Sequence, residues 1–341
     1  MLSSDPGGGP PRGPLVDRYG RVHRDLRISV TDRCSLRCTY CMPEDGVPWL
    51  PRTTMLSTPE IVRLAGIAVE MGIEEIRLTG GEPLLRRDLT DVVAGLATLD
   101  PAPEISMTTN GIGLSRIAQD LRSAGLTRVN ISIDTLDRET FIALAKRDRL
   151  TDTLAGIEAS AAAGLVPVKL NTVLMRGVND HEAPDLLGFA LEHGYELRFI
   201  EQMPLDAQHQ WDRTQMITGE EILQRLRTRF ELTALPDEAR GSAPAELFLV
   251  DGGPATVGVI ASVTMPFCGT CDRVRLTADG MIRNCLFATG ETDLRTPLRA
   301  GASDDRLAEL LRESIGAKLP GHGINEPTFL QPPRPMSRIG G

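Results

Sequence analysis

Three cysteines, Cys34, Cys38 and Cys41, stand close together near the start of the chain with the spacing C-x₃-C-x₂-C. They directly follow a strand-like segment, residues 26–30. Thiolates are the ligands of iron–sulfur clusters, and a four-iron cluster held by three of them keeps one iron open for a small molecule. The alternative is a zinc site completed by His23, although zinc knuckles are usually built on paired C-x₂-C spacings. The spacing therefore favours a cluster with an open iron.

A second group, Cys268, Cys271 and Cys285, contains the remaining cysteines of the chain. Its spacing, C-x₂-C-x₁₃-C, has no fourth soft ligand nearby, so it cannot form a closed Cys₄ zinc site alone. His322 could complete a Cys₃His zinc site, which is one interpretation. The other is a second cluster with an open iron, which could bind a heteroatom of a substrate directly.

Phosphate binding would have to rely on charged side chains. The chain has neither a G-x₄-G-K-[ST] loop nor a G-x-G-x-x-G turn, the common backbone cradles for phosphates. Cations do occur in strand-like segments and just after the second cysteine pair, and alternate residues of a barrel strand point into the lumen. Guanidinium groups suit phosphate oxygens, with roughly 1.5–3 kcal/mol per contact. The candidates are Arg27, Arg77, Lys169, Arg198, Arg273 and Arg275.

The elements that must position these groups are short β-branched strands alternating with amphipathic helices. The first helix shows a hydroxyl cap, an early proline and an early carboxylate at residues 57–60. Six parallel strands, each followed by a helix, predict an incomplete (βα)₆ relative of the TIM barrel, with chemistry at the carboxyl ends of the strands. We expect strands at 26–31, 74–79, 104–109, 128–133, 166–173 and 196–201, and helices at 59–71, 88–98, 114–124, 138–146 or 152–163, and 182–193.

The alternation breaks after residue 201. A helix is expected at 218–230, followed by a polar connector at 231–245 and a hairpin-like pair at 247–250 and 255–260. The predicted organisation is a disordered segment over 1–14, a partial barrel over 15–230, a smaller region with the second cysteine group over 231–330, and a tail over 331–341.

The composition is that of a globular protein, with 341 residues, 41% of them hydrophobic and 24% charged. A net charge of −9 argues against a nucleic-acid surface, which needs a basic face. No apolar run reaches membrane-spanning length, and residues 1–14 lack a hydrophobic signal core. We therefore expect a cytoplasmic protein without nucleic-acid or membrane partners, whose cysteines bind metal instead of forming disulfides.

The first cysteine group, followed by Met42-Pro43, resembles the signature of the radical S-adenosylmethionine (SAM) superfamily. With residues 79–83 (Thr-Gly-Gly-Glu-Pro), the second cysteine group and the terminal Gly-Gly, the chain is similar, from about Leu15 onward, to the radical SAM family that begins molybdenum cofactor biosynthesis. The resemblance implies two [4Fe–4S] clusters. One would cleave SAM to a 5′-deoxyadenosyl radical, and the other would bind the guanine of GTP. The implied reaction is the cyclisation of GTP to (8S)-3′,8-cyclo-7,8-dihydro-GTP.

The same resemblance assigns single residues. The SAM site would be lined by Tyr40, Gly81, Glu82, Ser132 and Met203. The contacts to GTP would come from Arg27, Arg77, Thr108, Lys169, Arg273, Val274 and Arg275, to which we add Arg198 from its position on the sixth strand. The terminal Gly340 and Gly341 would reach into the active site.

The implied partners are GTP, an electron donor such as flavodoxin or ferredoxin, and the next enzyme of the pathway, cyclic pyranopterin monophosphate synthase. Two other functions stay open on the residues alone. One is a radical SAM enzyme with an auxiliary cluster that modifies a peptide, which would not need a cationic lumen. The other is a non-enzymatic zinc-binding module.

Overall fold

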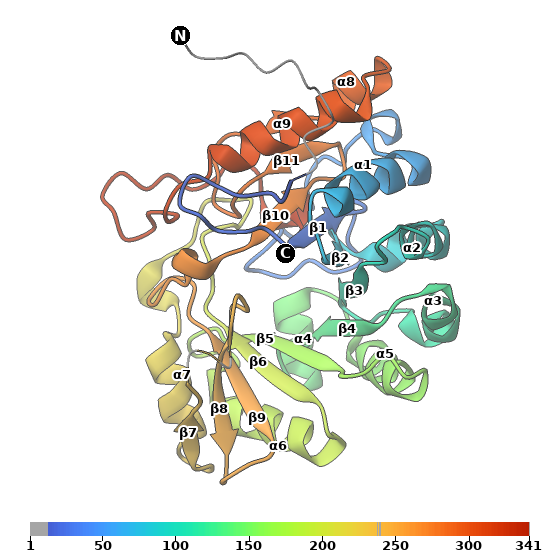
Figure 1. Ribbon diagram of the computed structural model, residues 1–341. Coiled ribbons are helices and arrows are strands. Elements are labelled where there is room, and N and C mark those ends of the chain that lie inside the picture. Colours follow the sequence, from blue (N-terminus) through green and yellow to red (C-terminus); the bar gives the residue numbers. More distant parts are fainter. Residues whose placement is uncertain (1–12, 237, 239, 341) are drawn as a thin grey trace.

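The computed structural model describes residues 13–236, 238 and 240–340. Within them, one curved sheet of twelve strands has the order β12-β11-β10-β1-β2-β3-β4-β5-β6-β9-β8-β7 (Figure 1). Neighbouring strands are parallel from β10 through β1 to β6 and on to β9. The central strands are β1 (Asp25–Ser29), β2 (Glu75–Thr79), β3 (Glu104–Thr109), β4 (Arg128–Ser132), β5 (Lys169–Val173) and β6 (Glu196–Ile200).

Helices follow the central strands and cover the outer face of the sheet (Figure 1). They are α1 (Thr58–Glu70), α2 (Leu89–Ala97), α3 (Ala118–Ala124), α4 (Arg138–Ala145), α5 (Leu150–Ala162), α6 (Ala183–His193) and α7 (Gly219–Leu226). Both segments that the sequence offered as alternatives, 138–146 and 152–163, are helical. Ser57 and Glu60 form the expected cap of α1, with the Glu60 carboxylate 2.7 Å from the Ser57 nitrogen. The predicted partial (βα)₆ barrel is confirmed.

The C-terminal part of the chain extends the barrel at both edges. The expected hairpin forms as β8 (Glu246–Val250) and β9 (Thr256–Ile260), and β9 pairs with β6. At the other edge, β10 (Arg273–Leu276) pairs with β1. Pairing in this way removes the unpaired edges that a six-stranded partial barrel would expose. The sequence did not predict β7 (Leu232–Ala234), β10, β11 (Met281–Arg283), β12 (Thr292–Asp293), α8 (Arg295–Arg299), α9 (Asp304–Gly316) or α10 (Met336–Ile339).

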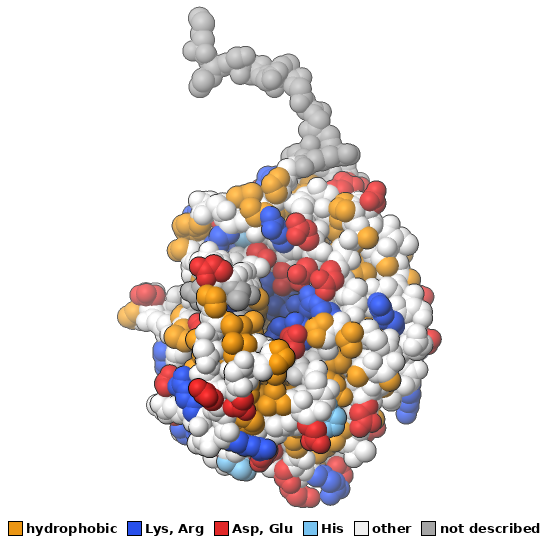
Figure 2. Space-filling view, turned by 60° about the horizontal axis from the view of Figure 1, so that its bottom comes forward, with side chains coloured by type: hydrophobic (Ala, Val, Ile, Leu, Met, Phe, Trp, Pro, Cys, Tyr) orange, Lys and Arg blue, Asp and Glu red, His pale blue; other side chains and the backbone are white. Residues whose placement is uncertain are grey.

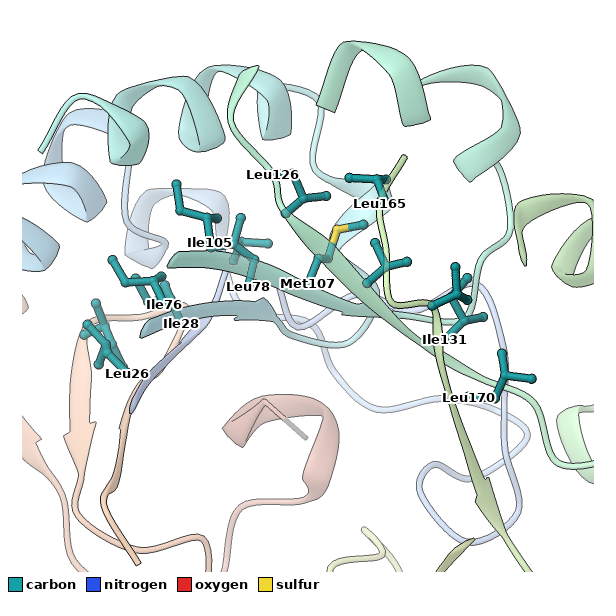
Figure 3. Close-up of a cluster of buried hydrophobic side chains, with 14 of the residues drawn as sticks. Leu26, Ile28, Ile76, Leu78, Ile105, Met107, Leu126, Ile131, Leu165 and Leu170 are labelled. Carbon is teal, nitrogen blue, oxygen red and sulfur yellow. The ribbon is translucent and has the colours of Figure 1, made fainter. Parts of the chain in front are cut away.

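Apolar and polar side chains alternate along the barrel strands, because successive residues of a strand face opposite sides. Figure 3 shows the apolar set, including Leu26, Ile76, Met107 and Leu170, on the side of the strands that faces the helices. These side chains are almost fully buried. The polar set therefore faces the lumen, where a TIM barrel normally packs branched apolar residues. A polar lumen is typical of a binding site.

The division of the chain at residues 15, 231 and 331 stays a prediction, and residues 1–12 of the segment expected to be disordered lie outside the described residues. No helix in the part of the chain that the structure describes is long and apolar enough to cross a membrane.

Candidate active site

The first cysteine group lines a cavity of about 230 Å³ at the carboxyl ends of the barrel strands. The residues predicted for the SAM site line the same cavity, and they come from the cysteine loop and from the ends of β2, β4 and β6. These lining residues are Cys34, Cys38, Tyr40, Cys41, Gly81, Glu82, Ser132 and Met203. The structure thus places all members of this set around one cavity, and their roles stay predictions.

The loop after β2 is bound directly to the cysteine loop. The N–H of Gly81 donates to the carbonyl oxygen of Thr31 over 2.8 Å, and the N–H of Glu82 donates to that of Arg33 over 2.7 Å. A Cβ at Gly80 would lie 2.3 Å from the Thr31 oxygen, and one at Gly81 would lie 2.3 Å from the Arg33 oxygen. Both glycines are therefore required for the two loops to meet, whatever the cavity binds.

Buried carboxylates after β2, β4 and β6 hold the neighbouring loops in place. Glu82 accepts hydrogen bonds from the Asn110 N–H and the Thr109 hydroxyl, at 2.7 and 2.6 Å. Asp134 accepts from the Val173 N–H at 2.9 Å and from the Tyr40 hydroxyl at 2.7 Å. The third carboxylate, Glu201, accepts from the backbone N–H groups of Gly219, Val263 and Thr264. All three line the first cavity. Burial raises the pKa of Glu82 to about 7, against the hydrogen bonds that lower it.

The donor chemistry of the first cavity fits an iron–sulfur cluster. Burial raises the pKa of the Cys34 thiol to about 11 and that of Cys41 to about 12. Thiolates are the form that binds metal, so the positive charge of a metal group is what would favour them here. In the described part of the chain no three His, Cys, Asp or Glu side chains converge on a point that could hold one metal ion. The three cysteines that line this cavity could each bind a different iron of a cluster.

The second cysteine group lines an adjoining cavity of about 160 Å³. The two cavities share part of their walls, and the shared residues are Thr108, Asn171, Ile200, Met203 and Met336. Cys268, Cys271 and Cys285 lie in the second cavity with Phe267 and His322. Burial raises the pKa of the Cys271 thiol, but the positive charges of Arg273 and Lys318, with hydrogen bonds from Arg273, together have the larger effect. The pKa is therefore lowered to about 7. This group therefore also fits a cluster held by thiolates.

Cations gather in the second cavity. On the face shown in Figure 2, Lys and Arg side chains (blue) collect in a central hollow. Arg275, Arg27 and Arg77 lie in register on the adjacent strands β10, β1 and β2. Asp25 lies two residues before Arg27 on β1, and its Oδ2 is 3.6 Å from the Arg27 Nε. Its negative charge interacts favourably with the positive charges of Arg27, Arg77, Arg273 and Arg275. The predicted GTP-contact residues that line this cavity are Arg27, Arg77, Thr108, Arg198, Arg273 and Arg275.

Four buried polar atoms of residues that line this cavity have no hydrogen bond among the described residues. They are the Arg27 Nε, the Arg273 Nη2, the Asn130 Oδ1 and the Asn171 Oδ1. Such groups are costly to leave unpaired. Although Asp25 opposes it, burial lowers the pKa of the Arg27 guanidinium to about 10, with Arg77 and Arg273 acting in the same direction. A polar, anionic ligand would relieve both costs.

Three of the predicted residues that the structure describes line neither cavity. The Lys169 ammonium pairs with Glu196 at 2.9 Å. The Val274 side chain is packed in the apolar core, so that its backbone alone could contact a ligand. Gly340 lies against Ser29 and Thr79, and its carbonyl oxygen accepts a hydrogen bond from Arg275. Gly341 lies outside the described residues.

The two histidines considered as zinc ligands lie near the second cysteine group. His23 is fully buried close to Asp17, Arg21 and Lys318, and it does not line the first cavity. His322 does line the second cavity, next to Phe287. The structure thus does not bring His23 to the cysteines that it was considered for.

Sequence reasoning missed several residues of the site. Asp25 stands two residues before Arg27 on β1, so the strand alternation alone could have placed both in the lumen. Lys318 and Met336 follow no local pattern, because the folding of distant segments brings them to the cysteines and to the shared wall.

The comparisons with known proteins agree with this geometry. Residues 28–190 match the model of the radical SAM superfamily, and residues 195–324 match the model described as Molybdenum Cofactor Synthesis C. The GTP 3′,8-cyclase of Streptomyces coelicolor is 62% identical over 328 residues, which cover 96% of each chain. The GTP 3′,8-cyclase 2 of Mycobacterium tuberculosis H37Rv is 56% identical over 99% of this chain and 95% of its own.

Solved structures with little sequence similarity share the fold. Streptococcus suis SuiB bound to S-adenosylmethionine superposes with a TM-score of 0.58 at 13% identity, covering 87% of this chain and 69% of its own. Native anSMEcpe with bound AdoMet gives 0.57 at 14% identity, covering 88% and 82%. These structures show the fold, whereas the full-length relatives and the family models show the family. The chain belongs to the GTP 3′,8-cyclase family of radical SAM enzymes.

Proposed function

We propose that this chain converts GTP to (8S)-3′,8-cyclo-7,8-dihydro-GTP, the first step of molybdenum cofactor biosynthesis, which is the reaction that the name of its relatives indicates. The observation that carries the proposal is the adjoining position of the two cavities. Each is lined by three cysteines, and the second also presents guanidinium groups.

As a member of the radical SAM family, the chain uses a [4Fe–4S] cluster and SAM. We assign that cluster to Cys34, Cys38 and Cys41, and a second [4Fe–4S] cluster to Cys268, Cys271 and Cys285. When bound, the first cluster and SAM supply the 5′-deoxyadenosyl radical that abstracts hydrogen. What remains for the protein is to bind the nucleotide, orient it and exclude water.

The arginines would bind the triphosphate. Arg27 and Arg273 have buried donor atoms without hydrogen bonds in the described residues, and both line the second cavity. Each charge-assisted hydrogen bond to a phosphate oxygen contributes about 1.5–3 kcal/mol. Asp25 offsets part of the repulsion between the guanidinium groups before the anion arrives.

The residues of the shared wall would orient the ribose between the two cavities. Thr108 and Asn171 offer polar groups there, while Ile200, Met203 and Met336 offer apolar surface. Apolar side chains beside the reacting carbon exclude water, which would otherwise give side reactions. No side chain is needed as a nucleophile in this arrangement.

We also propose that the electrons come from a flavodoxin or ferredoxin, and that the product passes to cyclic pyranopterin monophosphate synthase in the cytoplasm. These proposals follow from the family and from the need of the reaction for a reductant.

The test is anaerobic reconstitution of the protein with iron and sulfide, followed by incubation with GTP, SAM and dithionite. We expect 5′-deoxyadenosine and a cyclised nucleotide, both identified by mass spectrometry. Arg27→Met should weaken equilibrium binding of GTP by about 10- to 100-fold, which corresponds to one lost charge-assisted contact. The matched control is Arg24→Met, because Arg24 is exposed and pairs with Glu74 at 3.4 Å outside the cavity. SAM cleavage without GTP binding would point instead to a radical SAM enzyme for another substrate.

A further inference from the structure

Lys318 follows helix α9 and is 3% exposed. Its ammonium nitrogen lies 3.0 Å from the carbonyl oxygen of Arg273, 3.2 Å from that of Cys271, and 3.6 Å from the Cys271 sulfur. An ammonium group has three donors. All three can therefore be used by the short segment that begins at Cys271.

Arg21 holds the other end of the same loop. Its guanidinium donates to the carbonyl oxygen of Cys268 at 2.8 Å, and also to those of Leu319 and Pro320 at 2.6 and 3.1 Å. Asp17 accepts from the Arg21 Nε at 2.5 Å and so neutralises that cation. The N-terminal segment, the cysteine loop and residues 318–320 thus form one bonded unit.

Lys318 has neighbours that stabilise its positive charge and neighbours that oppose it. The acidic groups that stabilise its ammonium charge are the thiols of Cys271 and Cys285, whereas Arg21 and Arg273 oppose it. A buried cation is costly unless an anion pairs with it. Because Asp17 is bonded to Arg21, the thiolates are the counter-charge that Lys318 faces.

We propose that Lys318 is a positioning residue for the cluster at Cys268, Cys271 and Cys285, and that its ammonium group raises the reduction potential of that cluster. The inference rests on the second cluster assigned under the proposed function. Hydrogen bonds to a ligating sulfur and nearby positive charge both favour the reduced, more negative state of an iron–sulfur cluster. The same contacts fix the backbone from Cys271 to Arg273 and thereby orient the arginine that faces the substrate cavity.

The experiment uses the full chain with Cys34, Cys38 and Cys41 replaced by serine, so that the second group alone can hold iron. Iron and sulfide are determined after anaerobic reconstitution, and the cluster is titrated with a reductant while its electron paramagnetic resonance signal is recorded. Lys318→Met and Lys318→Arg are compared in this background. Arg306→Met is the matched control, since Arg306 is a half-exposed cation on α9 that pairs with Glu309.

We expect a midpoint potential shifted to a more negative value in Lys318→Met, a value close to the parent in Lys318→Arg, and no shift in the control. An unchanged potential in Lys318→Met, or equal shifts in both lysine variants, would overturn the role of Lys318. Should Lys318→Met take up no iron, Lys318→Gln is titrated instead, because it keeps N–H donors and loses the charge. An unchanged potential there would contradict the inference equally. Absence of iron from the parent itself would refute the second cluster, which is a separate failure.

Discussion

The N–H of Gly81 donates a hydrogen bond to the carbonyl oxygen of Thr31 over 2.8 Å, and this bond joins the Gly-Gly-Glu loop to the loop of the first three cysteines. Glu82 then fixes the loop after β3 through the N–H of Asn110. The first cavity is therefore built from loops that support one another, and a change in one of them is expected to reach the cysteines.

Gly81→Ala should displace the cysteine loop. The new Cβ would lie 2.3 Å from the Arg33 oxygen, which is backbone and cannot rotate away. We expect a loss of about 1–3 kcal/mol in the free energy of unfolding, as for other overpacked sites, together with reduced iron at the first group. Urea denaturation and iron analysis measure both. Gly316→Ala is the control, because a Cβ there meets nothing within 4 Å. Equal behaviour of the two variants would contradict the packing argument.

Asp25→Asn should destabilise the substrate-free protein. The substitution keeps the shape of the side chain but removes the charge that opposes Arg27, Arg77, Arg273 and Arg275. Leaving buried cations without their counter-ion costs roughly 3–5 kcal/mol. GTP supplies negative charge at the same place, so its stabilising effect should be larger in the variant than in the parent. Urea midpoints with and without GTP test this, with Glu74→Gln at an exposed pair as the control. A smaller effect of GTP in Asp25→Asn would count against an anion site here.

Replacing His23 by Leu should remove part of the acid sensitivity of the protein. Burial lowers the pKa of His23 from 6.5 to about 3, with Lys318 and Arg21 acting in the same direction and Asp17 opposing them. Between these values the unfolded chain binds the proton and the folded chain does not, so stability falls as the pH falls below 6.5. This group alone should cost about 2 kcal/mol between pH 7 and pH 5. The measurement is the difference in unfolding free energy at the two pH values. If parent and His23→Leu lose the same amount, His23 does not carry the effect.

The salt bridges of Arg334 should hold the C-terminal tail. Its guanidinium donates to both carboxylate oxygens of Asp279 at 2.9 Å, and its Nε lies 2.7 Å from Glu291. Arg334→Gln breaks this clamp, so trypsin should cleave after Arg338 at least about tenfold faster, because cleavage follows the population of the open state. Intact-mass measurements follow the cleavage. Arg299→Gln, which removes the ion pair between Arg299 on α8 and Glu60 on α1, should leave the rate unchanged.

Deleting Gly340 and Gly341 should leave the two proposed clusters intact and abolish turnover. The Gly340 carbonyl accepts from Arg275, and a Cβ at Gly340 would lie 2.7 Å from the Thr79 side chain. The tail end is thus fitted between a cation of the substrate cavity and the end of β2. Iron content and product formation are the two measurements. Full activity of the shortened chain would refute a role for the tail.

Strand periodicity made much of the fold predictable. Alternating apolar residues located β1 to β6, and cap signals located α1, because both depend on neighbours within a few residues. The additions at the barrel edges were missed. β10 is a short strand with two arginines among its four residues, and its pairing with β1 depends on segments far apart in the sequence.

The sequence by itself determined the chemistry, since cysteine spacing and the Gly-Gly-Glu loop are local patterns whose ligand types are set by the residues themselves. Tertiary structure alone decided which groups share a cavity. It placed the two cysteine groups on either side of a common wall and brought Lys318 to Cys271. Such contacts depend on long-range strand pairing and packing, and no short stretch of sequence encodes those distances.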